Sequence, residues 1–189
     1  MGNKKRASNS NEADTSNCYE GERLSRLLKS IHRGIESAKL LELNSLPEKF
    51  WYKQQFAVGV NEVTRVLERM PPAAKEIERP TKQHRAFCTN PKAPVVNLQA
   101  VLLASDCHPK WLTKHLPSLA SSRNVSVIHL KDQKGGSLRL GELVKVKTAM
   151  ALGIKARGND VNEIVERILR GHEACLKEED AQESTELGE

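Results

Sequence analysis

Short apolar runs that alternate with helical patterns are the feature that most constrains the fold of this chain. The runs "AVLLAS" (100–105), "VSVIHL" (125–130) and "TAMALGI" (148–154) are typical of buried strands, and a shorter run, "QFAVGV" (55–60), precedes them. Because helical segments separate the runs, helices must cover both faces of the sheet that the runs form. The sequence therefore predicts a three-layer α/β/α sandwich with a four-stranded mixed sheet.

The helical segments have identifiable starts and ends. The first begins at Glu22, and Asn44 and Pro47 end it, whereas Asn61 opens the second. A third helix, "HPKWLTKHLPSLASS", carries a proline near its first turn, and we expect Asp106 to cap it. After a short helix in "LRLGELVKV", the segment "NDVNEIVERILR" predicts a closing helix capped by Asn159 or Asp160.

Composition divides the chain into three parts. Residues 1–20 are polar and are expected to form a disordered N-terminal tail, and residues 21–172 form the α/β/α domain. Within that domain, residues 70–98 hold five of the eight prolines among several basic residues, which predicts an inserted mobile basic loop, partly ordered by RNA. Residues 173–189 form an acidic tail, which could serve as a docking segment, shield the basic face or remain a solvated terminus.

The charge distribution predicts a polyanionic partner. The chain has a net charge of +6, and its acidic tail contributes seven acids and one lysine, so the rest of the chain carries +12. A basic body of this kind favours nucleic acid as the partner. Four scattered cysteines indicate free thiols in a reducing compartment, and we expect no membrane partner because no apolar run approaches ~20 residues.

The segment "VGVNEVTRVLER" (58–69) concentrates unusual residues at the start of a helix. Gly59 allows close approach of another backbone, and Asn61 can donate or accept a hydrogen bond. Glu62 would repel phosphate, so its position in a basic chain suggests that it accepts from the amino or imino groups of a base. Arg65 and Arg69 could hold phosphates. The alternative is an ordinary helix start with an intrahelical Glu62–Arg65 pair.

This segment, together with "VLLASDCHPKWLTKHLPSLASSRNVSVIHL" (101–130), resembles the kink-turn-binding ribosomal-protein superfamily, which includes an archaeal large-subunit ribosomal protein and the core protein of box C/D particles. Members share an α/β/α sandwich and bind a bent RNA that contains tandem sheared G·A pairs. The resemblance covers roughly residues 50–70 and 98–155. It implies that Gly59, Asn61, Glu62 and Arg65 face the G·A pairs and the adjoining backbone, and that Arg69 makes a further basic contact.

The resemblance also implies a second set of contacts, with the nucleotide that bulges from the bend. His108 and Leu112 match positions that contact this nucleotide, and Lys145, Val146 and Lys147 match the loop that clasps it. Both sets should meet at one end of the sandwich. The chain departs from the family pattern in having Val58 before the glycine and no second glycine and proline around the clasping loop.

Within the superfamily, "FAVGVNEVTRVLER" and "VKVKTAMALGI" look closest to the protein subunit of nuclear ribonuclease P and ribonuclease MRP. This similarity implies a non-catalytic role in the processing of precursor tRNA and rRNA, with structured RNA and other protein subunits as partners. It also implies residence in the nucleus and nucleolus. We expect no catalytic residue, no small-molecule substrate, no metal and no cofactor.

Other interpretations remain open. A zinc site could be drawn from His84, Cys88, Cys107 and His108, but the adjacent Cys107 and His108 cannot easily reach one metal. Asp106 and His108 could form an acid–base pair of an enzyme. The chain could also be a ribosomal or small nucleolar particle protein of the same fold, or a protein-interaction module that uses it.

Overall fold

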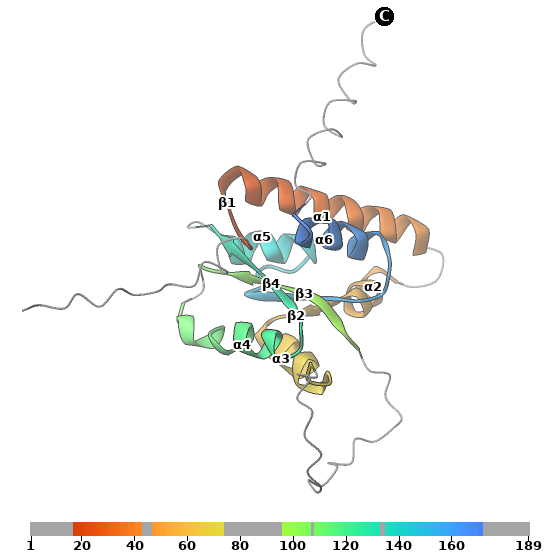
Figure 1. Ribbon diagram of the computed structural model, residues 1–189. Helices are drawn as coiled ribbons and strands as arrows, with labels where there is room; N and C mark the ends of the chain where they lie inside the picture. The colour runs from red at the N-terminus through yellow and green to blue at the C-terminus, as the bar shows by residue number, and fades with distance from the viewer. Residues whose placement is uncertain (1–16, 43–46, 74–95, 107, 133–134, 172–189) are drawn as a thin grey trace, which may run out of the picture.

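A computed structural model describes residues 17–42, 47–73, 96–106, 108–132 and 135–171 of the chain. These ranges form one sheet with helices on both faces (Figure 1), which confirms the predicted α/β/α class. The strands are β1 (Cys18–Glu20), β2 (Phe56–Val58), β3 (Leu98–Ala104), β4 (Ser126–Lys131) and β5 (Ala151–Lys155). The helices are α1 (Gly21–Glu42), α2 (Glu48–Gln55), α3 (Val60–Arg69), α4 (His115–Ser121), α5 (Gly136–Leu143) and α6 (Asp160–Leu169), with a 3₁₀ turn at Lys110–Leu112 before α4.

The sheet is mixed and has five strands in the order β1-β4-β3-β5-β2, so the predicted number of four is wrong. Strands β1, β4 and β3 run parallel, and β5 is antiparallel to both β3 and β2. The additional strand, β1, falls inside the segment 1–20 that we expected to be disordered. Its three residues carry no periodic signal, and they form a strand because they pair with His129–Lys131 of β4 and bury Tyr19.

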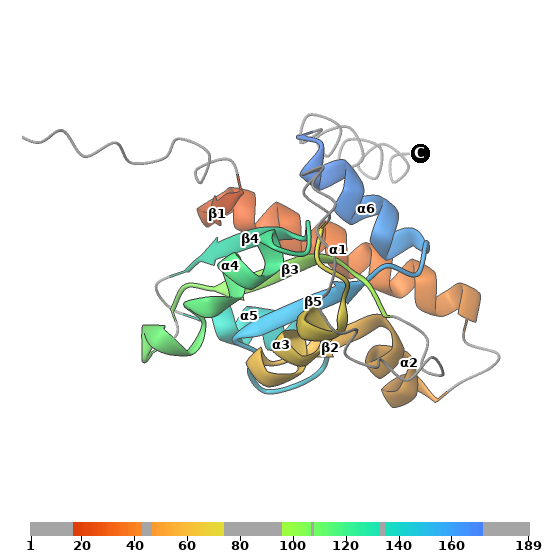
Figure 2. The ribbon, with the colours of Figure 1, turned by 60° about the horizontal axis from the view of Figure 1, so that its bottom comes forward.

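Two apolar layers flank the sheet. Helices α1, α5 and α6 lie on one face, and α3 and α4 lie on the other (Figures 1 and 2). The side chains of β3 divide between the two layers in alternation, with Leu102 in the first and Val101 and Leu103 in the second. This near-continuous apolar run is typical of a strand that is buried on both faces.

Helix α2 is a feature that the sequence analysis missed. Its buried aromatic residues belong to the first layer, where Trp51 packs edge-on against Tyr52 with ring centroids 5.3 Å apart. The Trp51 indole donates to Glu42 at the end of α1 over 2.6 Å, and Gln55 accepts from Asn159 at the start of α6 over 2.8 Å. These bonds hold α2 against α1 and α6, and because β2 follows α2 directly, α2 lies close to the segment 58–69.

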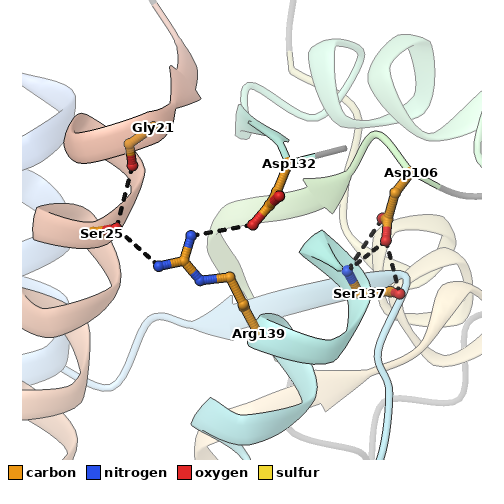
Figure 3. A network of polar contacts seen from close by, with 6 residues as sticks. All are labelled: Gly21, Ser25, Asp106, Asp132, Ser137 and Arg139. Atoms are coloured by element: carbon orange, nitrogen blue, oxygen red, sulfur yellow. Dashed lines mark hydrogen bonds and ion pairs between the residues drawn. The ribbon is translucent and has the colours of Figure 1, made fainter. Parts of the chain in front are cut away.

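The helix caps agree with the sequence in one case and differ in the other. Of the two predicted candidates, Asn159 and Asp160, it is Asn159 that caps α6, in a reciprocal capping box with Asn162. Asp106 does not cap the helix that follows it in sequence. Its carboxylate accepts from the backbone N–H and the hydroxyl of Ser137 at 3.1 Å, and so caps α5 (Figure 3). The cap crosses between chain segments because the end of β3 lies beside the start of α5, whose own N-cap is a glycine.

Several predicted features fall wholly or largely outside the described ranges. They are the acidic tail, most of the basic insertion (74–95) and most of the N-terminal tail (1–16). Within the described ranges, no helix has an apolar stretch long enough to cross a bilayer.

Candidate nucleic-acid interface

The start of α3 is shaped by Gly59. This residue has φ = +90°, a conformation that side chains oppose, and its N–H donates to the carbonyl of Ala151 in β5 over 2.8 Å. No side chain caps the helix. A Cβ on Gly59 would meet nothing within 4 Å, so the space beside this turn is open to a partner. The glycine is therefore required by the backbone, and the approach that we expected it to permit remains available.

The polar residues of α3 line up behind this turn. Asn61 is exposed, and the side chains of Glu62 and Arg65 retain 43% and 58% of their accessible surface. Glu62 and Arg65 form an ion pair of 3.2 Å, as the alternative interpretation expected. An exposed pair of this kind stabilises a fold by about 0–1 kcal/mol, so a ligand can exchange it at small cost. Arg69 is exposed in the last turn of the helix.

The loop between α5 and β5 carries Lys145, Val146 and Lys147, all exposed. Gly141 in α5 sets its path, because the N–H groups of Val144 and Val146 both donate to the Gly141 carbonyl, over 3.1 and 3.0 Å. A Cβ on Gly141 would lie 2.6 Å from the Val146 oxygen. The loop can fold back over α5 only because this residue is glycine, which the sequence analysis did not notice.

A groove of about 690 Å³, here named the α2 groove, brings the start of α3 and this loop together. Glu62 lies in one wall, and Lys145 and Val146 lie in another. The remaining lining residues come from α2, β2 and β5, with Val144 from the end of α5: Glu48, Lys49, Tyr52, Lys53, Phe56, Val58, Val144 and Lys155. The groove thus combines an apolar floor with four lysines and two carboxylates.

Ion pairs already organise the charges of the α2 groove. Glu48 accepts from Lys145 over 2.5 Å and from Lys39 of α1 over 2.8 Å, and these two bonds lower the pKa of the Glu48 carboxyl from 4.5 to about 2. The hydrogen bond that Lys39 donates to Glu48 raises the pKa of the largely buried Lys39 ammonium group. Lys155 donates to the Lys53 carbonyl over 2.6 Å, and burial lowers the pKa of its ammonium group.

A second groove, of about 360 Å³ and here named the α4 groove, lies on the other side of the first turn of α3. Asn61 and Arg65 line it together with Leu112 of the 3₁₀ turn. Thr64 and His115 join its two walls through a hydrogen bond of 2.8 Å. The other lining residues are Val60, Glu68 and Trp111.

The structure therefore gathers most of the predicted site around one turn of helix. Asn61, Glu62, Arg65, Leu112, Lys145 and Val146 line one groove or the other, and Gly59 forms the turn between them. Among the described residues, His108, Lys147 and Arg69 are exposed but line neither groove. Their contacts with RNA stay predictions.

Several residues of these grooves were not identified from the sequence. Glu48, Lys49, Tyr52 and Lys53 enter the α2 groove because α2 precedes β2 directly. The aromatic and basic character of "EKFWYKQQ" was the available signal. In the α4 groove, Trp111 was detectable as one of only two tryptophans in the chain.

The structure bears on one of the two alternative chemical sites, the acid–base pair, and leaves most of the zinc candidates outside the described ranges. Asp106 is engaged by Ser137 as a helix cap, which assigns it a structural role. Of the four residues considered for zinc, only His108 is described. Across the described ranges, no group of three or more histidine, cysteine, aspartate or glutamate residues could hold a metal ion.

Comparison with known proteins finds a family model that matches part of the chain. The model of the family described as "Ribosomal protein L7Ae/L30e/S12e/Gadd45 family" matches residues 94–164, which run from just before β3 into α6. This match confirms the superfamily resemblance seen in the sequence. It includes His108, Leu112 and residues 145–147, whereas α3 lies outside it.

Comparison with solved structures adds relatives in fold. The Giardia lamblia 15.5kD RNA binding protein is similar to this chain, with 18% sequence identity and a TM-score of 0.49 over 84% of this chain and 93% of that chain. No curated protein sequence matches the chain.

Proposed function

We propose that this chain binds RNA and recognises a kink-turn-like element as a non-catalytic subunit of nuclear ribonuclease P or ribonuclease MRP. In that role it would take part in the processing of precursor tRNA and rRNA, in the nucleus and nucleolus. The superfamily match and the basic body of the chain support RNA as the ligand. The similarity of "FAVGVNEVTRVLER" and "VKVKTAMALGI" to the ribonuclease P/MRP subunit supports the particular particle.

The observation that carries the proposal is the convergence around the first turn of α3. Glu62 and Lys145 are 83 positions apart in sequence, yet they line the same groove. Asn61, the residue before Glu62, lines the second groove with Leu112. A single turn of helix therefore presents base-reading groups between an apolar clasp and a set of cations, as recognition of a bent RNA with a bulge requires.

Each group has a distinct chemical task in this proposal. The Glu62 carboxylate accepts from guanine amino or imino hydrogens of the G·A pairs, and Asn61 contacts base edges or sugar. Arg65 and Lys145 hold phosphates, which fixes the orientation of the RNA. Val146, with 41% of its surface exposed, packs against the bulged base. None of these tasks involves bond cleavage, so the chain assembles the particle and leaves the reaction to other components.

Other protein subunits would dock on exposed apolar side chains at the ends of two helices, next to the α2 groove. The end of α1 and the start of α2 expose Leu40, Leu41 and Phe50, with 74%, 77% and 56% of their surfaces accessible. The salt bridge between Lys39 and Glu48 holds these two helix ends together. Large exposed apolar side chains of this kind favour a protein contact.

The experiment is a titration of the full chain against a fluorescent kink-turn RNA and a control RNA whose tandem G·A pairs are replaced by Watson–Crick pairs. Glu62→Ala and a matched control, Glu163→Ala on the exposed side of α6, are measured with both RNAs over a salt series. We expect Glu62→Ala to weaken binding of the kink-turn by about 10- to 150-fold, because a hydrogen bond to a charged group contributes ~1.5–3 kcal/mol.

The sign of the Glu62 effect separates the alternatives. Removal of a carboxylate strengthens binding to any polyanion if only the net charge matters, whereas it weakens binding if the carboxylate reads a base. Equal affinity for both RNAs, with tighter binding by Glu62→Ala, would contradict the proposal. If the proposal holds, sequencing the RNA recovered with the protein from cells would identify the particle as ribonuclease P, ribonuclease MRP, a small nucleolar particle or a ribosome.

A further inference from the structure

The two tryptophans of this chain have opposite environments. Trp51 is 4% exposed and its indole donates to Glu42, so packing and a hydrogen bond explain it. Trp111 is 69% exposed on the 3₁₀ turn before α4. Trp111 therefore contributes little to the stability of the fold. Its position is notable because aromatic residues make up only 4% of the chain. Tryptophan supplies a large flat surface for binding, and an exposed one indicates a contact with a partner.

The surroundings of Trp111 indicate the kind of partner. It shares the α4 groove with Asn61 and Arg65, two residues of the proposed kink-turn surface. The wall opposite the 3₁₀ turn is largely polar, in contrast to the apolar pockets that receive hot-spot residues at protein interfaces. The hydrogen bond between Thr64 and His115 holds this wall against the segment that carries Trp111.

Charge next to Trp111 complements a polyanion. Lys110 is the first residue of the 3₁₀ turn and Lys114 lies two residues beyond its end, and both are exposed. Arg65 is a third cation and lines the groove itself, where Glu68 is the one lining carboxylate, and Arg65 also pairs with Glu62 over 3.2 Å. A groove with an aromatic surface, cations at its rim and polar groups in its wall has the components that proteins use to bind single-stranded nucleic acid.

We propose that Trp111 is a stacking platform for an unpaired nucleobase of the bound RNA. Arg65, Lys110 and Lys114 would hold the phosphates on either side of this base. It is a second unpaired base, in addition to the one that family resemblance assigns to His108 and Leu112. The inference rests on the proposed function, because it places the stacked nucleotide directly beside the kink-turn surface. It extends the recognised element from a bent duplex to a bent duplex with an adjoining single-stranded segment.

The test uses the intrinsic fluorescence of Trp111 in the full chain, with buried Trp51 as a constant background. The probes are an unstructured RNA oligonucleotide, a kink-turn RNA, and the same kink-turn RNA with added unpaired nucleotides. The variants are Trp111→Ala, Trp111→Phe and the control Leu138→Ala, which removes an exposed apolar side chain from α5 on the other face of the sheet. Circular dichroism verifies that each variant is folded.

We expect the RNA with unpaired nucleotides to quench Trp111 fluorescence and to bind Trp111→Ala about tenfold more weakly than the unaltered chain, given the size of base–aromatic stacking. Trp111→Phe should retain most of the affinity because it keeps an aromatic face, and Leu138→Ala should change nothing. The salt dependence should be the same for Trp111→Ala and the unaltered chain, since no charge is removed.

Three results would overturn the inference. They are the absence of quenching by any of the probes, unchanged affinity of Trp111→Ala, and loss of a protein partner by Trp111→Ala while RNA binding is retained. The proposed function is tested separately by the G·A dependence of binding. Kink-turn binding that needs the G·A pairs but ignores Trp111 would therefore remove this inference and leave the proposed function in place.

Discussion

The two grooves beside α3 differ in how their charges are held. In the α2 groove, Glu48 pairs with Lys145, and Lys155 donates to a backbone carbonyl, so two of the cations are engaged before any ligand arrives. In the α4 groove, Arg65 pairs with Glu62 over 3.2 Å, but the indole of Trp111 is uncharged and 69% exposed. RNA binding to the first groove must therefore exchange one set of ionic contacts for another. The second groove offers stacking that requires no such exchange.

The α2 groove and the α4 groove, on the two sides of the first turn of α3, are therefore suited to different roles in RNA binding. When a phosphate replaces the Glu48 carboxylate at Lys145, the free energy of binding changes little. The exchange still favours a ligand whose phosphates match the positions of the lysines. Stacking adds affinity that tolerates any base. The α2 groove is thus suited to reading RNA shape, and the α4 groove to adding affinity. Variants that affect one groove and spare the other test this division.

The largest effect is expected from Gly141→Ala. The new Cβ would lie 2.6 Å from the Val146 oxygen and 2.8 Å from the Thr148 nitrogen, so the loop with Lys145 and Val146 must move. We expect a loss of about 1–3 kcal/mol in the free energy of unfolding, and roughly tenfold weaker binding of kink-turn RNA. Urea denaturation and RNA titration measure the two effects.

Gly136→Ala in the same helix is the matched control for Gly141→Ala. Its Cβ would lie 3.2 Å from a carboxylate oxygen of Asp106, a tight contact that a small shift of this side chain would relieve, so we expect a smaller change in stability than for Gly141→Ala, whose Cβ meets backbone atoms. Equal stability and RNA affinity of the two variants would show that the loop does not depend on close packing over Gly141.

A smaller effect of opposite sign is expected from Glu48→Gln. The substitution releases Lys145 toward phosphate and removes a negative charge from the α2 groove, so kink-turn RNA should bind about threefold more tightly. Glu36→Gln is the control, because it removes the other partner of Lys39 without affecting Lys145. Weaker binding by Glu48→Gln than by Glu36→Gln would mean that Glu48 positions Lys145 instead of competing for it.

The pH dependence of stability should report the same ion pairs. The pKa of Glu48 is about 2 in the folded chain, below its ordinary value of 4.5, so its contribution is complete above pH ~5. This contribution is lost as the pH falls from 4.5 toward 2. Denaturation midpoints of the unaltered chain and Glu48→Gln should therefore converge below pH 4. A constant difference between them across this range would contradict the assignment.

The smallest effect is expected from Thr64→Val, which removes the hydrogen bond to His115 and keeps the shape of the side chain. We expect a loss of about 0.5–1 kcal/mol in stability and little change in binding through the α2 groove. A double-mutant cycle with His115→Ala isolates the pair. A coupling energy near zero would show that the hydrogen bond does not hold the walls of the α4 groove together.

Parts of the fold that depend on long runs could be predicted, and parts that depend on short segments could not. Strand β3 is a long apolar run, and helices α1, α3 and α6 carry apolar residues at helical spacing. The type and approximate bounds of these elements therefore follow from the sequence. Strand β1 has three residues and exists only through its pairing with β4. Helix α2 has eight residues, and its apolar stripe is two aromatic residues wide.

By itself, the sequence determined the alternating order of strands and helices, the basic body and the composition of the 58–69 segment. These are local properties, because periodicity, charge and the φ of Gly59 belong to single segments. Only the tertiary structure decided that Asp106 caps α5, that Glu48 holds Lys145, and that Trp111 faces the same groove as Arg65. Each of these contacts joins segments that are far apart in sequence, and chain packing, which no local pattern encodes, brings them together.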